Sequence, residues 1–188
     1  MGVRKWREMD YLTPQMVAHW QNFYVVTGSS AGALTGLQFV VITLVAQARA
    51  GDDVRNIHAF GTPTVIHFCT ALLLSALMTA PWESVAALGG VLAGCGVAGI
   101  AYAIRVFWHA RRAAYRPDRA DWFWYLILPP IAHLILLGSA LLIWWAMPWS
   151  LVLVAVDVLI FLSLGVHNSW DTVTYLIIGH GSRPKEPS

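Results

Sequence analysis

Long apolar stretches, separated by short polar connections, make up most of this chain. Five of them are long enough to cross a hydrocarbon core, which takes about 20 helical residues. We predict spans at Phe23–Ala48, Phe60–Ala80, Val85–Trp108, Trp122–Met147 and Leu151–His167, the last with a possible continuation to Ile178. The pattern predicts an all-α fold, an integral membrane bundle of about five transmembrane helices occupying residues 23–178.

The residues before the first span predict a separate short helix. Thr13 followed by Pro14 is typical of an N-cap with proline at the first helical position. Residues 1–22 are therefore interpreted as an N-terminal interfacial segment, with Trp20 and the aromatic pair after it as anchors at the outer membrane surface. Two interpretations stay open: a stable lead-in to the first span, or a lid over an external opening.

Composition and charge agree with a membrane location. Of the 188 residues 57% are hydrophobic and 12% charged, half of the roughly 25% charged residues typical of soluble domains. Residues 8–22 contain no continuous apolar run, so no cleaved signal peptide is predicted. Basic residues gather in the two longer connections and the tail: Arg49, Arg55, Arg111, Arg112, Arg116, Arg119, Arg183 and Lys185.

This distribution of positive charge predicts the orientation. Cytoplasmic loops concentrate Lys and Arg, so the basic connections and the C-terminus are placed in the cytoplasm and the N-terminus outside. Arg4, Lys5 and Arg7 oppose this orientation, but they stand at the limit of the distance over which such charges count. Residues 179–188 are predicted to be a disordered cytoplasmic tail.

Small residues recur every four positions in the first and third spans. In lipid, helices associate through close backbone contact, which small side chains permit. We therefore predict that the first and third helices pack closely, either within one chain or between copies. The residues concerned are Gly28, Gly32 and Gly36 in the first span, and Gly90 and Gly94, flanked by Ala86 and Ala98, in the third.

Three short motifs carry a resemblance to a known group. Trp20-x-x-Phe23-Tyr24, ALTGLQFV at 33–40 and NSWD at 168–171 resemble motifs of a widespread group of small, uncharacterised bacterial membrane proteins. The resemblance implies a multi-pass protein of the bacterial inner membrane. It implies no activity.

Asp157 is the most conspicuous polar residue inside a span. It lies about 12 Å from the outer end of the fifth span, at 1.5 Å per residue. The fourth span runs antiparallel to the fifth, and His133 is nearly equidistant from the turn that joins them. We predict that His133 and Asp157 meet near the middle of the membrane. Such a pair suits a proton relay or an ion-binding step, or a neutral hydrogen bond between two helices.

The second span carries a narrow polar stripe at four-residue spacing. His67, Ser75 and Thr79 share this face, and Gln38 of the first span lies at the depth of His67 by the same distance rule. Such a stripe either lines a wet path or bonds to a neighbouring helix. Both interpretations remain open.

A salt bridge between Arg105 and Asp171 is predicted at the cytoplasmic end. If the fifth helix continues past His167, Asp171 reaches the depth of Arg105 near the inner end of the third span. Snorkelling of Arg105 to lipid headgroups is the alternative. The basic stretch 105–119 serves as a topology signal or an anionic-lipid patch, and neither role involves nucleic acid.

Motifs for several kinds of chemistry are missing from the sequence. It contains no Walker loop, no HExxH, no GxSxG and no metal-spaced cysteines, so no metal site or cofactor is predicted. A bis-histidine haem is disfavoured because His67 and His133 differ by about 6 Å in estimated depth.

The function predicted first is a channel or transport-type conduit for an ion or small solute. It would be a homo-oligomer, because five helices are few to surround an aqueous lumen. The alternative is a non-catalytic accessory or scaffold subunit of a larger membrane complex. A membrane redox or lipid-modifying enzyme ranks below both.

Overall fold

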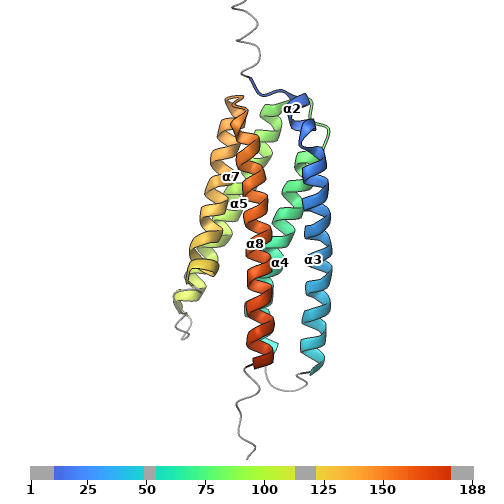
Figure 1. Ribbon diagram of the computed structural model, residues 1–188. Helices are drawn as coiled ribbons and strands as arrows, with labels where there is room; N and C mark the ends of the chain where they lie inside the picture. Colours follow the sequence, from blue (N-terminus) through green and yellow to red (C-terminus); the bar gives the residue numbers. More distant parts are fainter. Residues whose placement is uncertain (1–10, 49–53, 113–121, 179–188) are drawn as a thin grey trace, which may run out of the picture.

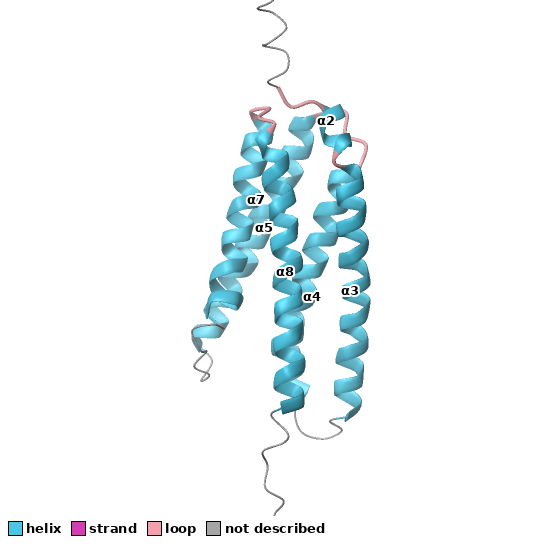
Figure 2. Ribbon diagram, viewed as in Figure 1, coloured by secondary structure: helices cyan, strands magenta, loops and turns pink. Residues whose placement is uncertain are grey.

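The computed structural model describes residues 11–48, 54–112 and 122–178, and the side chains of residues 45–63, 109–112, 172 and 175–178 lie outside the description. Within these ranges the chain is all-helical, with six α-helices, one π-helical segment and no strand (Figures 1 and 2). The elements are α2 (Pro14–His19), α3 (Gln21–Ala48), α4 (Val54–Thr79), α5 (Val85–Arg112), η1 (Trp122–Ile127), α7 (Leu128–Trp144) and α8 (Trp149–Ile178). The predicted all-α class is confirmed, and the longer form of the last helix is the correct one.

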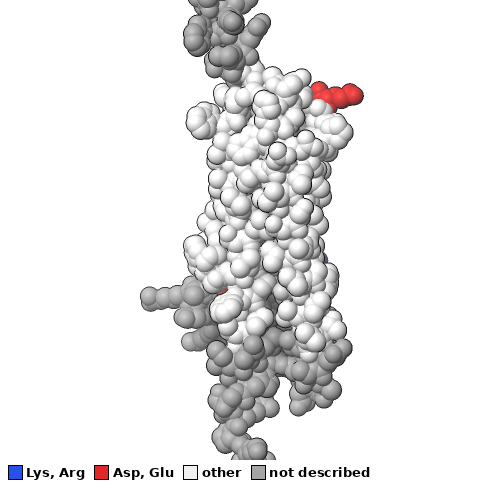
Figure 3. Space-filling view, turned by 45° about the vertical axis from the view of Figure 1, so that its right-hand side comes forward, with Lys and Arg blue, Asp and Glu red and all other residues white. Residues whose placement is uncertain are grey.

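Four of the helices are long and apolar enough to cross a membrane. Among the described residues these stretches are Gln21–Leu44, Val85–Trp108, Trp122–Trp144 and Trp149–Asp171, while α4 contributes the shorter apolar stretch Thr64–Thr79. The face seen in Figure 3 is almost free of charged side chains between its two ends. Large apolar side chains point outward instead, as at Val26 and Leu37. A molecule with this surface fits a lipid environment.

The helices pack in a different order from the chain order. α3 packs on α4, α4 on α8, α8 on α7 and α7 on α5 (Figure 1). α8 is therefore the central helix, with α4 on one side and α7 on the other. The predicted close packing of the first and third helices within the chain is wrong, since α3 and α5 have no substantial contact.

The predicted glycine stripes divide between buried and outward positions. A Cβ added at Gly28 would lie 2.9 Å from Cβ of Ser75, so the lack of a side chain at Gly28 lets α4 approach α3 closely. Gly32 faces Leu72, which also belongs to α4. Gly36, Gly90 and Gly94 have no neighbouring atom within 4 Å of such a Cβ. These three glycines lie on the outer surface of the bundle and pack no helix of this chain.

The close approach of α5 to α7 uses other glycines. A Cβ at Gly89 would lie 3.1 Å from the carbonyl oxygen of Ala140, and one at Gly96 would lie 3.3 Å from Cβ of Leu137. Together with Gly99, these positions are seven and three residues apart, a spacing that keeps them on one face of α5 at a helix–helix seam. The prediction from four-residue spacing chose Gly90 and Gly94, on the exposed face of α5, instead of Gly89 and Gly96. Both faces of α5 are rich in small residues, so spacing alone does not show which face is packed.

The segment before α3 crosses one end of the bundle. Thr13 caps α2 as predicted, with its hydroxyl oxygen accepting from the Met16 N–H at 3.4 Å. The Leu12 N–H donates to the carbonyl oxygen of Ala146 at 2.7 Å, which ties the segment to the turn between α7 and α8. Leu12 and Val17 are both buried in the core cluster. The segment thus covers this end of the bundle, whereas its position at a membrane interface stays a prediction.

The fourth predicted span is divided by a change of helix type. Pro129 and Pro130 lack the N–H groups that an α-helix would donate to Tyr125 and Leu126, and their rings would clash with those carbonyls. The chain forms the wider π-helix η1 immediately before α7, which removes the conflict. The adjacent prolines are the sequence signal for this change.

Several predictions fall on residues outside the description. They concern residues 1–10 of the N-terminal segment, the basic residues of the connections 49–53 and 113–121, and the tail 179–188.

Candidate functional site

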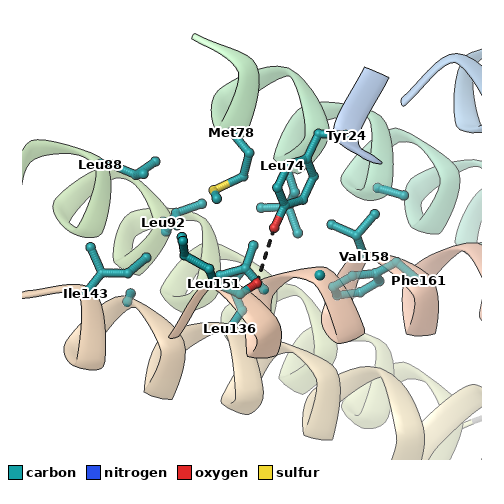
Figure 4. Packing of buried hydrophobic residues seen from close by; sticks show 14 of the residues in the cluster. Tyr24, Leu74, Met78, Leu88, Leu92, Leu136, Ile143, Leu151, Val158 and Phe161 are labelled. Atoms are coloured by element: carbon teal, nitrogen blue, oxygen red, sulfur yellow. Dashed lines mark hydrogen bonds between the residues drawn. The ribbon is translucent and has the colours of Figure 1, made fainter. Parts of the chain in front are cut away.

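Asp157 of α8 lies fully inside the bundle. Its side chain is 0% exposed, and among the described residues neither carboxylate oxygen has a hydrogen-bond partner. Tyr24 of α3 is near enough to interact with it electrostatically. The Tyr24 hydroxyl donates to the carbonyl oxygen of Leu151, at 3.4 Å, so that its polar end is held against α8 (Figure 4). Asp157 therefore faces protein and lies on the side of α8 that α3 approaches.

His133 does not form the predicted pair with Asp157. Its ring packs on Phe161 instead, with centroids 4.8 Å apart and planes inclined at 48°. Phe161 lies one turn after Asp157, about 6 Å further along the helix at 1.5 Å per residue. Counting residues from the α7–α8 turn therefore placed His133 about one helical turn away from its actual level on α8, because the shape of the turn at Ala146 and the packing of the two helices set their relative shift.

His67 of α4 approaches the same phenylalanine. The centroids of His67 and Phe161 are 6.1 Å apart with planes inclined at 30°, and His67 also interacts electrostatically with His133. Both imidazoles are 4% exposed, and Nδ1 of each has no hydrogen-bond partner in the described part of the chain. Both imidazoles thus pack near one ring, and the expected difference of about 6 Å between their depths stays a prediction.

We call Phe161 and the His67 and His133 rings that pack on it the aromatic layer. Two glycines make room for side chains in and next to it. The His133 ring occupies the space of a Cβ at Gly99 of α5, and the Phe68 ring occupies that of a Cβ at Gly165 of α8. Phe161, Gly99 and Gly165 were not recognised in the sequence. The only signals were that Phe161 follows Asp157 by one turn and that Gly99 lies at seam spacing from the α5 glycines above.

The predicted path-lining residues go to separate partners. Gln38 accepts from the Ser169 hydroxyl of α8 at 3.0 Å, and Ser75 lies 3.1 Å from the Thr27 hydroxyl of α3. Thr79 is partly exposed and donates within its own helix, to Ala76. Of the four residues predicted for the path, His67 alone reaches the aromatic layer.

Asp171 pairs with a residue of its own helix rather than with Arg105. The Nε2 atom of His167 lies 3.1 Å from the Asp171 carboxylate, one turn away. The His167 ring also stacks on Trp124 of η1, with centroids 3.8 Å apart. The π-helical segment carries Trp124 to this position, and the predicted Arg105–Asp171 salt bridge is not formed.

The chemistry available inside the bundle is that of protonatable groups in an apolar environment. Among the described residues, His67 and His133 are buried titratable side chains that pack on Phe161, Asp157 lies one turn before it, and the Tyr24 hydroxyl lies at Leu151, six residues before Asp157. No group of three or more His, Cys, Asp or Glu side chains suited to a metal ion occurs among the described residues. Carboxylates and imidazoles in such surroundings hold and release protons or bind a cation transiently.

No protein-family model, curated protein or solved structure matches the chain. The resemblance to small bacterial membrane proteins therefore stays a prediction, and the function has to be argued from the site.

Proposed function

We propose that this protein is a channel or transport-type conduit of the bacterial inner membrane that carries an ion or small solute. It crosses the membrane five times, with the N-terminus outside and the C-terminus in the cytoplasm. One observation supports this proposal above the others: a fully buried aspartate, without a hydrogen-bond partner among the described residues, inside a largely apolar bundle.

The energetic argument rests on Asp157. Burying an ionised carboxylate without a partner costs several kcal/mol even after relaxation. A residue with a purely structural task would be neutralised by a salt bridge or satisfied by hydrogen bonds. Intramembrane acids that face protein instead mark ion pathways and proton relays. The nearby Tyr24 hydroxyl and the two imidazoles supply the further polar groups that such a pathway uses.

A homo-oligomer belongs to the same proposal. Gly90 and Gly94 are exposed on α5, and no atom of the described residues lies within 4 Å of a Cβ at either position. Small residues spaced four apart allow a second transmembrane helix to approach closely. Contact between copies through α5 is one of the alternatives left open by the sequence, and it agrees with the absence of a partner for this face within the chain.

The test is a flux measurement on the purified protein in liposomes. Asp157→Asn removes the charge while keeping the shape of the side chain, and we expect loss of ion or proton flux. Asp171→Asn, at the half-exposed end of the same helix, is the matched control and should conduct normally. Absence of flux through the wild type, or full flux through Asp157→Asn, would contradict the proposal.

A second candidate, an accessory subunit of a membrane complex, is favoured by the interhelical hydrogen bonds. Gln38 bonds to Ser169 and Thr27 to Ser75, which are contacts that hold helices together. Under this alternative, Asp157→Asn leaves partner binding unchanged. Gentle solubilisation of the native membrane should then recover a stoichiometric partner, and isolation of the chain alone would count against it.

A further inference from the structure

We propose that the transported species is the proton, and that Phe161 blocks the passage of water and other ions at the middle of the bundle. This inference rests on the proposed conduit function and names its substrate. It is carried by the position of one aromatic ring among the buried polar groups.

Phe161 forms an apolar layer enclosed from two sides. The residue is 0% exposed, and its ring contacts His67 from α4 and His133 from α7. One turn further along α8, the Phe68 ring lies directly against Gly165. Figure 4 shows Phe161 among the buried side chains of α8, beyond Val158 as seen from Leu151. Two aromatic rings about one turn apart along α8 therefore fill the space where α8 faces α4 and α7.

Buried polar groups lie on α8 on both sides of this layer. Asp157 precedes Phe161 by one turn, whereas Asn168 and Ser169 follow it by about two turns, roughly 10–12 Å at 1.5 Å per residue. Ser169 donates to Gln38 of α3 at that level. An ion moving between the two polar levels would have to shed its water in the aromatic layer, and hydrophobic constrictions of this kind stop ions by excluding water.

A proton can pass such a layer without carrying a hydration shell. Each imidazole can accept a proton on one nitrogen and release one from the other. His67 and His133 flank Phe161, so they bypass the ring on two sides. Among the described residues, the two histidines are the titratable groups that contact Phe161, Asp157 of α8 lies one turn before it, and Tyr24 of α3 interacts electrostatically with Asp157.

The transfer balances without any redox step. The Asp157 carboxyl gives its proton to an imidazole across about one helical turn, a gap that one bridging water spans. Asp157 becomes a carboxylate and the histidine an imidazolium. The imidazolium then releases a proton toward the level of Ser169, and Asp157 takes up a new one from the side of Tyr24. One proton has then crossed and Asp157 is protonated again, while the imidazole is left in its other tautomer and returns to its starting form when the ring turns over.

The experiment compares proton and potassium fluxes in liposomes containing the full chain. A pH-sensitive dye inside the liposomes reports proton entry, and a potassium-sensitive dye reports potassium entry. We expect the wild type to pass protons and exclude potassium. Phe161→Ala should raise the potassium flux at least about tenfold, because removal of the ring lets water into the constriction. His67→Gln combined with His133→Gln should abolish proton flux in the presence of Phe161.

Two further variants keep the result interpretable. Phe161→Leu retains most of the packing volume if the alanine variant does not fold, and it should admit less potassium than alanine does but more than the wild type. Phe39→Ala removes an exposed aromatic ring of α3 and should leave both fluxes unchanged.

The outcomes separate this inference from the proposed function. Potassium flux through the wild type that Asp157→Asn abolishes would preserve the conduit and overturn proton selectivity. Unchanged selectivity in both Phe161 variants would overturn the role of the ring. Absence of flux for every ion would remove the conduit itself.

Discussion

The imidazole ring of His133 lies in the space that a side chain at Gly99 would occupy. These residues belong to α7 and α5, the pair whose seam also contains Gly89 and Gly96. The contact directs the His133 ring between α5 and Phe161 rather than toward Asp157. A glycine on a neighbouring helix thus determines which partner the histidine meets.

Gly99→Ala should displace His133 from Phe161. The added methyl group overlaps the ring, and forcing extra volume into a packed core costs about 1–3 kcal/mol. Gly36→Ala of α3 is the control, because no described atom lies within 4 Å of its Cβ position and alanine favours the helix. Thermal unfolding in detergent measures both. Equal stability of the two variants would contradict the packing of His133 against Gly99.

Gly165→Ala should disturb the Phe68 ring in the same way. The new Cβ would overlap three atoms of that ring, and the rigid helix α8 cannot move aside without losing its packing on α4. We expect destabilisation by about 1–3 kcal/mol, the usual cost of overpacking. Gly138→Ala of α7 has open space and should unfold no more easily than the wild type. A larger loss in Gly138→Ala than in Gly165→Ala would show that α8 packs differently.

The Thr27–Ser75 contact should couple α3 to α4. Their hydroxyl oxygens lie 3.1 Å apart in a buried position, beside the close approach at Gly28. In a double-mutant cycle with Thr27→Val and Ser75→Ala, the coupling energy should be about 0.6 kcal/mol, the average for such bonds in membranes. Thr43→Val is the control. The Thr43 hydroxyl bonds within α3, to the carbonyl oxygen of Phe39, and to no other helix among the described residues, so this variant should give no coupling energy with Ser75→Ala.

Ala146→Gly should stabilise the turn between α7 and α8. Ala146 has a φ of 55°, the only positive value among the described non-glycine residues. Its N–H bonds to Ile143 and the next N–H to Leu142, which is the helix-ending arrangement that normally has glycine at this place. Relief of the left-handed conformation is worth about 1 kcal/mol.

The control for this turn is an alanine-to-glycine change inside a helix. Ala101→Gly on the exposed face of α5 should lower stability by about 1 kcal/mol, so the two variants shift the unfolding temperature in opposite directions. A decrease in both would mean that the turn does not hold Ala146 in the left-handed region.

The sequence alone determined the helices and the apolar character of their surface. Length and hydrophobicity located α3, α4, α5 and α8 to within a few residues at most ends, because a helix that satisfies its own backbone is required in lipid. The cap at Thr13 was equally readable, since it depends on two adjacent residues. Such features depend on residues that are close neighbours in the sequence, so they can be predicted from it.

The tertiary structure decided which faces meet. In lipid the outward face is as apolar as the buried one, so hydrophobic periodicity does not identify the packing side, and glycine spacing selected an outward stripe at Gly90 and Gly94. The side chains that lie next to Asp157, His133 and Asp171 depend on how far neighbouring helices are shifted along each other. A shift of one helical turn replaces one neighbour with another, as it places Phe161 instead of Asp157 beside His133. That shift depends on the Ala146 turn and on the fit of the His133 ring against Gly99 and of the Phe68 ring against Gly165, and these two fits join residues far apart in the chain.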